Sequence, residues 1–171
     1  MKSPLPLQDQ PDLDCRPLYR TLAASVCVIT GRGESGPVGM TASSVTAVSL
    51  APPLLAVTLA PTSPTLGALR KTGQFVVNVL ADDQRALSAR FGGGRPGWAR
   101  FSGISLPVAE PPRLADALAH ALCSVEWERC CGDRVLVIGR VRRSEVSDRT
   151  PLLWHRSGYH ALRPLPSGAL G

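Results

Sequence analysis

The sequence has few aromatic residues, few histidines and no long apolar run. Phe, Trp and Tyr make up 5% of its 171 residues, and only three histidines accompany five cysteines, none of them in a CxxC spacing. A zinc site is therefore not expected, and we predict no metal. The longest apolar stretch, LAPPLLAVTLA, is too short and too rich in proline to cross a bilayer, so we expect no membrane partner.

Neither the basic nor the acidic residues form a continuous block in the sequence. Lys and Arg number 19 against 13 Asp and Glu, a net charge of +6, but the basic residues are scattered. Arg140 and Arg142 would share one face of an expected strand while Arg143 points to the other face, and no aromatic residues alternate with them. We therefore expect no nucleic-acid partner.

The two ends of the chain differ in composition from its middle. The first residues, MKSPLPLQDQPDLD, are rich in Pro, Asp and Gln and lack the apolar segment of a signal peptide. The odd number of cysteines is typical of reduced thiols in the cytosol. We predict a cytoplasmic protein with a disordered arm at 1–14, one domain at 15–165 and a flexible tail at 166–171.

Short β-branched and apolar runs separated by turn residues predict a mainly β fold with inserted helices. A first helix is expected over 16–24, and another, DDQRALSARF, over 82–91 with Asp82 as its cap. Because closure removes exposed strand edges, six or seven antiparallel strands predict a small closed barrel. The expected strands lie at 25–32, 38–50, 54–60 (buried on both faces), 74–80, 117–130, 134–146 and 158–165.

A further helix has both of its ends marked in the sequence. Ser63 suits the N-cap, Pro64 the first helical position and Gly73 the C-terminal cap. The surrounding TSPT motif, 62–65, is typical either of a simple helix cap or of a helix start that binds phosphate through its backbone N–H groups. The two interpretations are compatible.

Two other segments concentrate side chains that could contact a ligand. In GMTASSVTAVS, 39–49, hydroxyl groups lie between apolar strands, which favours a concave site for a planar ligand; a solvent-facing strand would have the same composition. In PLLWHRSGYHAL, 151–162, Trp154 and Tyr159 either contact a ligand ring or fill the core.

From about Leu18 to Leu162 the motifs, in order, resemble the short-chain flavin reductases of the flavin-reductase-like, FMN-binding split-barrel family. The resemblance implies a six-stranded antiparallel Greek-key split β-barrel and a homodimer with active sites near the subunit interface. It also implies reduction of free FMN or FAD by NADH or NADPH for a partner monooxygenase. The matching segments are ASVCVIT, GPVGMTASSVTAVSLAPPLLAVTL, SPTLGALRKTGQFVVNVLADDQRALSARFGG, RFSGI, GDRVLVIGRV and PLLWHRSGYHAL.

The resemblance also implies which residues contact the flavin. Residues 40–44 would line the ring, the TSPT motif would hold the phosphate, and arginine-aromatic pairs at 90–91 and 100–101 would lie beside the cofactor. The chemistry would be that of the flavin, oriented by the protein. The expected cofactor-binding residues are Met40, Thr41, Ala42, Ser43, Ser44, Thr46, Thr62, Ser63, Thr65, Asn78, Arg90, Phe91 and Tyr159.

The chain departs from the family pattern at a turn in CCGDRVLVIGRVRR. The family typically has Gly-Asp-His there, a histidine linked with the nicotinamide, whereas this chain has Arg134; it also has Arg140 where an acid is usual. A guanidinium keeps a hydrogen-bond donor but gives up acid-base chemistry near neutral pH. Arg134 and His155 are the candidate catalytic residues, while Cys130 and Cys131 are interpreted as ordinary thiols.

The change at Arg134 leaves three functions open. The first is the flavin reductase itself. The second is a barrel that keeps its flavin and performs a different redox reaction on an organic substrate. The third is a flavin- or haem-binding module without enzymatic activity.

Overall fold

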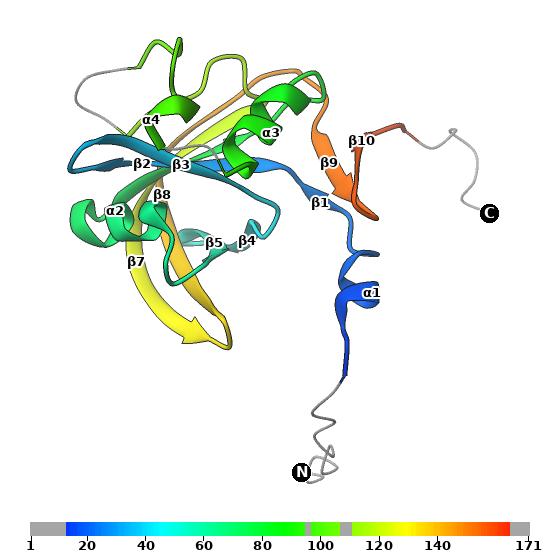
Figure 1. The fold of residues 1–171 in the computed structure, drawn as a ribbon, viewed down its shortest axis with the longest axis horizontal. Helices are drawn as coiled ribbons and strands as arrows, with labels where there is room; N and C mark the ends of the chain where they lie inside the picture. Colours follow the sequence, from blue (N-terminus) through cyan, green and yellow to red (C-terminus); the bar gives the residue numbers. More distant parts are fainter. Residues whose placement is uncertain (1–12, 95–96, 107–110, 165–171) are drawn as a thin grey trace, which may run out of the picture.

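The computed structural model describes residues 13–94, 97–106 and 111–164. Most of the expected N-terminal arm and the whole expected tail at 166–171 lie outside these residues. The described chain is mainly β, as the sequence predicts (Figure 1). Its elements are α1 (Arg16–Tyr19), β1 (Ala24–Ser25), β2 (Cys27–Gly33), β3 (Gly36–Ala42), β4 (Thr46–Leu50), β5 (Pro53–Leu59), α2 (Pro64–Thr72), β6 (Gln74–Val79), α3 (Arg85–Gly92), α4 (Gly97–Arg100), β7 (Ala119–Cys131), β8 (Arg134–Val146), β9 (Leu152–His155) and β10 (Gly158–Ala161).

The strands form two antiparallel sheets. The larger has seven strands in the order β3-β2-β6-β7-β8-β5-β4, and the smaller has the order β1-β9-β10. The β7–β8 hairpin, with strands of 13 residues each, forms the longest arm of the fold. Among the described residues the edge strands β3 and β4 do not pair with each other, so the expected closure into a barrel is not observed.

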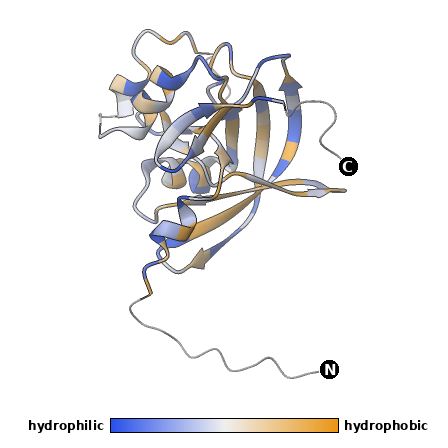
Figure 2. Ribbon diagram, turned by 90° about the vertical axis from the view of Figure 1, so that its right-hand side faces the viewer, coloured by the Kyte–Doolittle hydropathy of each residue, from blue (hydrophilic) through white to orange (hydrophobic). Residues whose placement is uncertain are grey.

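Strand β2 is buried on both faces, and its side chains belong to two separate apolar clusters. Cys27 and Ile29 belong to a cluster beneath α2, whereas Val26 and Val28 belong to a second cluster that includes residues of α3. This follows from the alternation of side chains along a strand. Figure 2 shows the hydrophobic residues running along the strands in the interior of the fold.

Helix α2 begins and ends where the sequence predicts, although the Ser63 side chain makes no capping hydrogen bond. Ser63 is the N-cap, with extended backbone at φ −66° and ψ 125°. Gly73 has a φ of 67°, in the left-handed region that favours glycine, and its N–H donates to the Leu69 carbonyl at 2.8 Å. The two marked residues therefore define where this helix begins and ends.

The other two expected helices are shorter than predicted. The prediction over 16–24 is wrong beyond Tyr19 because Ala24 already pairs with Trp154 in the smaller sheet. The second helix begins at Arg85 and its cap is not Asp82. The backbone N–H of Asp82 instead donates to the Thr150 carbonyl at 2.9 Å, which holds this residue outside the helix.

Strand β3 separates the helices that surround it. α2 packs on β2 and β3 on one side, and α3 and α4 pack on β3 on the other (Figure 1). Alternate residues of β3 therefore face different helices. Among the described residues, no helix has the length and apolar content needed to cross a membrane.

Candidate functional site

A cavity of about 280 Å³ lies where α2 begins. Its walls come from three elements that are distant in sequence: the middle of β3, the first residues of α2 with its cap, and α4. The lining residues are Val38, Gly39, Met40, Ser63, Pro64, Thr65, Gly97 and Arg100. Three of the expected flavin-binding residues, Met40, Ser63 and Thr65, thus meet in one cavity.

Ser63 occupies the N-cap position of α2 without capping the helix through its side chain. Its Oγ instead donates to the sulfur of Met40 at 3.3 Å, across the cavity. Because the N–H groups of a first helical turn have no intrahelical partners, the start of α2 offers donors and the positive end of the helix dipole. This arrangement suits a phosphate or another anion.

Arg100 places a permanent positive charge in the wall of the same cavity. Its Nη1 donates to the Gly39 carbonyl at 2.8 Å, and its Nη2 donates to the Gly93 carbonyl at 2.7 Å. These bonds fasten α4 to β3 and to the end of α3. The residue next to it, Phe101, is buried, and its ring meets Phe91 edge-on with centroids 4.9 Å apart.

A second cavity, of about 290 Å³, lies on the opposite face of β3 and includes Thr41, Ser43 and Tyr159. Thr41 Oγ1 donates to the Ser88 carbonyl at 2.7 Å, and the hydroxyls of Ser88 and Tyr159 are 3.0 Å apart. Trp154 packs edge-on against Tyr159 with centroids 4.9 Å apart. The expected ring-binding residues are therefore divided between two cavities, because successive residues of β3 point to opposite faces.

Four other expected cofactor-binding residues lie outside both cavities. Ser44 Oγ donates to the Thr58 carbonyl at 3.1 Å and accepts from the Thr58 N–H at 3.2 Å, which ties the bend to β5. Ala42 is buried in the core, and Thr46 and Thr62 are exposed. None of these four residues lines either cavity.

Asn78 lies in the interior rather than at a cavity wall. It is 0% exposed, and its Nδ2 donates to the Val28 carbonyl at 2.9 Å and to Thr30 Oγ1 at 3.1 Å. Its Oδ1 accepts from the Leu114 N–H at 2.8 Å. With these bonds the amide joins β6 to β2 and to the segment before β7, which is a structural role.

Arg90 and Phe91 contact the segments that surround the cavity but do not line the cavity itself. Arg90 Nη2 donates to the carbonyls of Ala99, at 3.3 Å, and Ser102, so it holds the segment around α4. Phe91 is 1% exposed and belongs to the core. Neither residue lines the cavity at the start of α2.

The two candidate catalytic residues lie at different ends of the fold. Arg134 begins β8, with its side chain 51% exposed and its Nε 3.7 Å from the Asp133 carboxylate. His155 ends β9, where its ring meets the ring of His160 at 5.6 Å between centroids. His155 lines neither cavity.

Arg140, the second departure from the family pattern, is occupied by an ion pair. Its Nε and Nη2 donate to the two carboxylate oxygens of Glu126 at 2.9 Å and 2.6 Å. This bidentate contact across the β7–β8 hairpin lowers the pKa of Glu126. The pair supports a role for Arg140 in the hairpin itself.

Sequence reasoning missed two residues that shape the cavities. Ser88 is 1% exposed in α3 and bridges Thr41 and Tyr159; a serine on the apolar face of a helix is a weak signal of this. Gly39 has no signal of its own. A Cβ at Gly39 would lie 3.0 Å from Phe91 Cε1 and 3.1 Å from Phe101 Cζ, so glycine allows α3 and α4 to approach β3.

The sequence and the fold both match known proteins. A family model described as the flavin reductase like domain matches residues 19–163. The chain belongs to this family. It is 36% identical over 153 residues to the reductase subunit HsaB of a flavin-dependent monooxygenase from Rhodococcus jostii (strain RHA1), covering 85% of this chain and 77% of that protein.

Two further proteins similar to this chain are named for different flavins. The chain is 35% identical over 163 residues to an NADH:FMN oxidoreductase from Rhodococcus qingshengii, covering 91% of this chain and 83% of the relative. Its structure matches that of the NADH:FAD oxidoreductase SgcE6 from Streptomyces globisporus C-1027 with a TM-score of 0.82. That match has 28% identity and covers 95% of this chain and 100% of the other.

Proposed function

We propose that this protein is an NAD(P)H-dependent flavin reductase that binds its flavin at the start of α2. The observation that carries the proposal is the cavity in which Met40, Ser63, Thr65 and Arg100 meet, in a chain of the flavin reductase family. A phosphate suits the helix start, where first-turn N–H groups and the Arg100 guanidinium supply positive charge. The thioether of Met40 provides an apolar surface beside it.

Flavin fits these residues because the cavity joins an anion site to an apolar wall. A bound flavin supplies the redox chemistry by accepting a hydride on its ring system. The chain contributes binding and orientation: Ser63 and Thr65 lie at the phosphate end, and Met40 lies toward the ring. Arg100 fixes the distance between β3 and α4 through its bond to the Gly39 carbonyl.

Arg134 is part of the proposal as the residue that attracts the nicotinamide nucleotide. Val135 pairs with Leu59, the last residue of β5, and the chain runs from there directly to α2. Arg134 therefore lies beside the loop that leads to the proposed phosphate site. Its permanent charge suits a pyridine-nucleotide phosphate, but it does not exchange protons near neutral pH. A catalytic role for His155 remains a prediction.

The reduced flavin would be passed to a partner monooxygenase. This proposal is supported by the name of the similar HsaB, a reductase subunit of a flavin-dependent monooxygenase. A cytoplasmic location belongs to the same proposal, and the five free thiols support it because thiols stay reduced there.

We further propose that the protein is a homodimer formed through the edge strand β4. Val48 and Leu50 on this strand are 50% and 95% exposed, and its backbone edge is unpaired in the described chain. Leu50→Lys should shift the mass measured by light scattering toward the monomer. The control Ala86→Lys, which adds the same charge at an exposed site on α3, should not. A wild-type monomer would contradict the proposal.

The six-stranded Greek-key split barrel is the architecture that we propose for the core of the larger sheet. Strands β3, β2, β6, β7, β8 and β5 are consecutive neighbours in this sheet, and β4 extends its edge. The antiparallel pairing of all these neighbours supports the proposal.

The proposed function is tested by mixing the protein anaerobically with FMN or FAD and then with NADH or NADPH. We expect the visible absorbance of the oxidised flavin to bleach orders of magnitude faster than without protein. Bleaching at the uncatalysed rate with every combination would contradict the proposal. A protein that purifies with stoichiometric flavin and ignores both nicotinamides would instead match the alternative of a retained flavin.

A further inference from the structure

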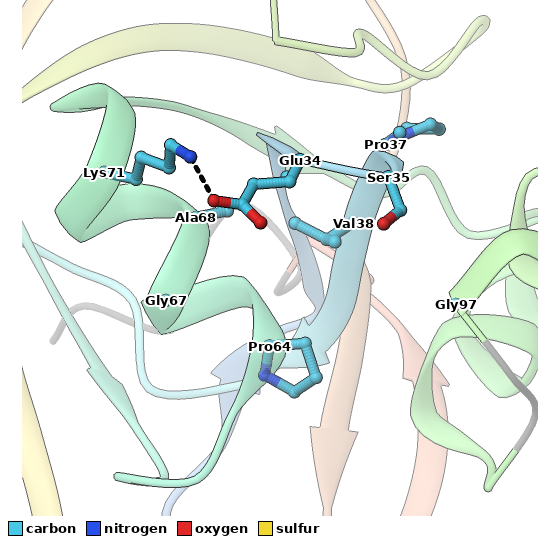
Figure 3. A pocket seen from close by; sticks show the side chains of 11 residues that line it. Glu34, Ser35, Pro37, Val38, Pro64, Gly67, Ala68, Lys71 and Gly97 are labelled. Carbon is cyan, nitrogen blue, oxygen red and sulfur yellow. Dashed lines mark hydrogen bonds and ion pairs between the residues drawn. The ribbon is translucent and has the colours of Figure 1, made fainter.

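A third cavity, of about 440 Å³, adjoins the proposed flavin site. It lies between the β2–β3 turn and the exposed face of α2 (Figure 3). Val38, Pro64 and Gly97 line both this cavity and the one at the start of α2. The two cavities therefore form one continuous groove, which runs from Ser63 and Thr65 along α2 toward Lys71.

The walls of this groove are suited to a flat aromatic group. Pro37, Val38, Pro64 and Ala68 give it apolar sides. At Gly67, in the middle of the groove, no side chain covers the helix backbone. A Cβ built at this position would meet no atom within 4 Å, so the space beside it is open. A planar ring can thus approach the helix backbone more closely than it could beside any other residue.

The far end of the groove is polar. Lys71 and Glu34 form an ion pair there, from α2 and from the β2–β3 turn (Figure 3). Their side chains are 59% and 74% exposed, so both can turn toward a ligand. Together they present a cation and a carboxylate, which suit the amine and hydroxyl groups of a nucleoside.

The length of the groove limits what can occupy it. From Pro64 to Lys71 the helix rises roughly 10 Å at 1.5 Å per residue, comparable to the length of an adenosine monophosphate. FMN ends at its phosphate and would leave this space empty. We propose that the groove binds the adenosine end of FAD, so that this chain takes FAD in preference to FMN. The inference rests on the proposed function, because it places the flavin phosphate at Ser63 and Thr65.

Gly67→Leu tests the inference by filling the groove from the helix. Gly67→Ala is the matched control, because it also removes a helical glycine but adds only one methyl group. Both substitutions should favour the helix, so loss of folding does not explain a loss of binding. Isothermal titration calorimetry with FAD and with FMN then gives the two dissociation constants for each protein.

We expect the wild-type protein to bind FAD at least about tenfold more tightly than FMN. The reason is that only FAD has an adenosine group, which would bury additional apolar surface in the groove. Gly67→Leu should weaken FAD binding by about tenfold and change FMN binding by less than about twofold. Gly67→Ala should leave both close to the wild-type values.

Three outcomes would overturn the inference. They are equal wild-type affinities for FAD and FMN, an equal loss for both flavins in Gly67→Leu, and an increase in the KM for NADH without a change in FAD affinity. The last would assign the groove to the nicotinamide nucleotide. If no flavin is reduced by NADH or NADPH, the proposed function fails instead, while the calorimetric comparison of FAD with FMN can still be made.

Discussion

Ser63 and Met40 meet across the cavity at the start of α2, with the Ser63 hydroxyl donating to the Met40 sulfur at 3.3 Å. A thioether is a weak acceptor, so the hydroxyl can turn to a phosphate at little cost. Because the Ser63 side chain makes no bond to the N–H groups of α2, ligand binding and helix capping can be separated at this residue.

Ser63→Ala should weaken flavin binding without unfolding the protein. Loss of one hydrogen bond to a charged phosphate should raise the dissociation constant for FMN about tenfold. The free energy of unfolding, from urea denaturation, should fall by less than about 1 kcal/mol, since no side-chain cap is lost. Ser105→Ala, at an exposed position, is the control. Lower stability with unchanged FMN affinity would show that Ser63 serves the helix alone.

Arg134→His should make the use of nicotinamide depend on pH. The imidazole carries a positive charge below its ordinary pKa of about 6.5 and loses the charge above it, whereas the guanidinium of the wild type stays charged. The KM for NADH in the variant should therefore rise between about pH 6 and pH 8 relative to the wild type. Steady-state kinetics over this range measures the ratio. Parallel profiles for the two proteins would mean that the charge of Arg134 does not act on the nucleotide.

Asn78→Leu should destabilise the fold because it removes a fully buried amide that makes three hydrogen bonds. The Val28 carbonyl and the Leu114 N–H would lose their partner, and an unsatisfied buried group costs about 1–3 kcal/mol. We expect a loss of about 3 kcal/mol in urea denaturation. The control Gln74→Leu, at an exposed position on the same strand, should cost far less. A similar loss for the two variants would contradict the structural role.

The five cysteines should differ in reactivity. Burial raises the pKa of Cys27 and of Cys123 to about 12, so near neutral pH both thiols stay protonated and inaccessible. Cys130 and Cys131 are exposed at the end of β7. Iodoacetamide followed by peptide mass spectrometry should label this exposed pair in the native protein, and label Cys27 and Cys123 only after denaturation. Native labelling of either buried thiol would contradict their placement.

Local signals in the sequence predict the parts of the fold that local chemistry determines. Ser63, Pro64 and Gly73 mark the ends of α2, and Gly132, with a φ of 60°, forms the turn between β7 and β8. The helix expected at Asp82 starts late because a backbone bond to Thr150, far along the chain, holds this segment. The sequence around Asp82 contains no signal of such a long-range contact.

The site is only partly predictable for the same reason. The TSPT motif indicates the start of α2, but the cavity also needs Arg100, and its bond to the Gly39 carbonyl depends on how α4 packs on β3. Asn78 is a single polar residue in an apolar strand, which fits either a ligand contact or a buried bridge. Its partners Val28 and Leu114 come from distant segments, so only the tertiary structure distinguishes the two.

A crystal structure of the protein with FMN tests the central claim most directly. The two cavities on opposite faces of β3 are two alternative binding sites for the flavin, and a crystal structure distinguishes them. We expect the phosphate to lie within hydrogen-bonding distance of the Ser63 hydroxyl and of the first N–H groups of α2, with Met40 beside the flavin. FMN bound instead between Thr41 and Tyr159, with the start of α2 free of phosphate, would contradict the account.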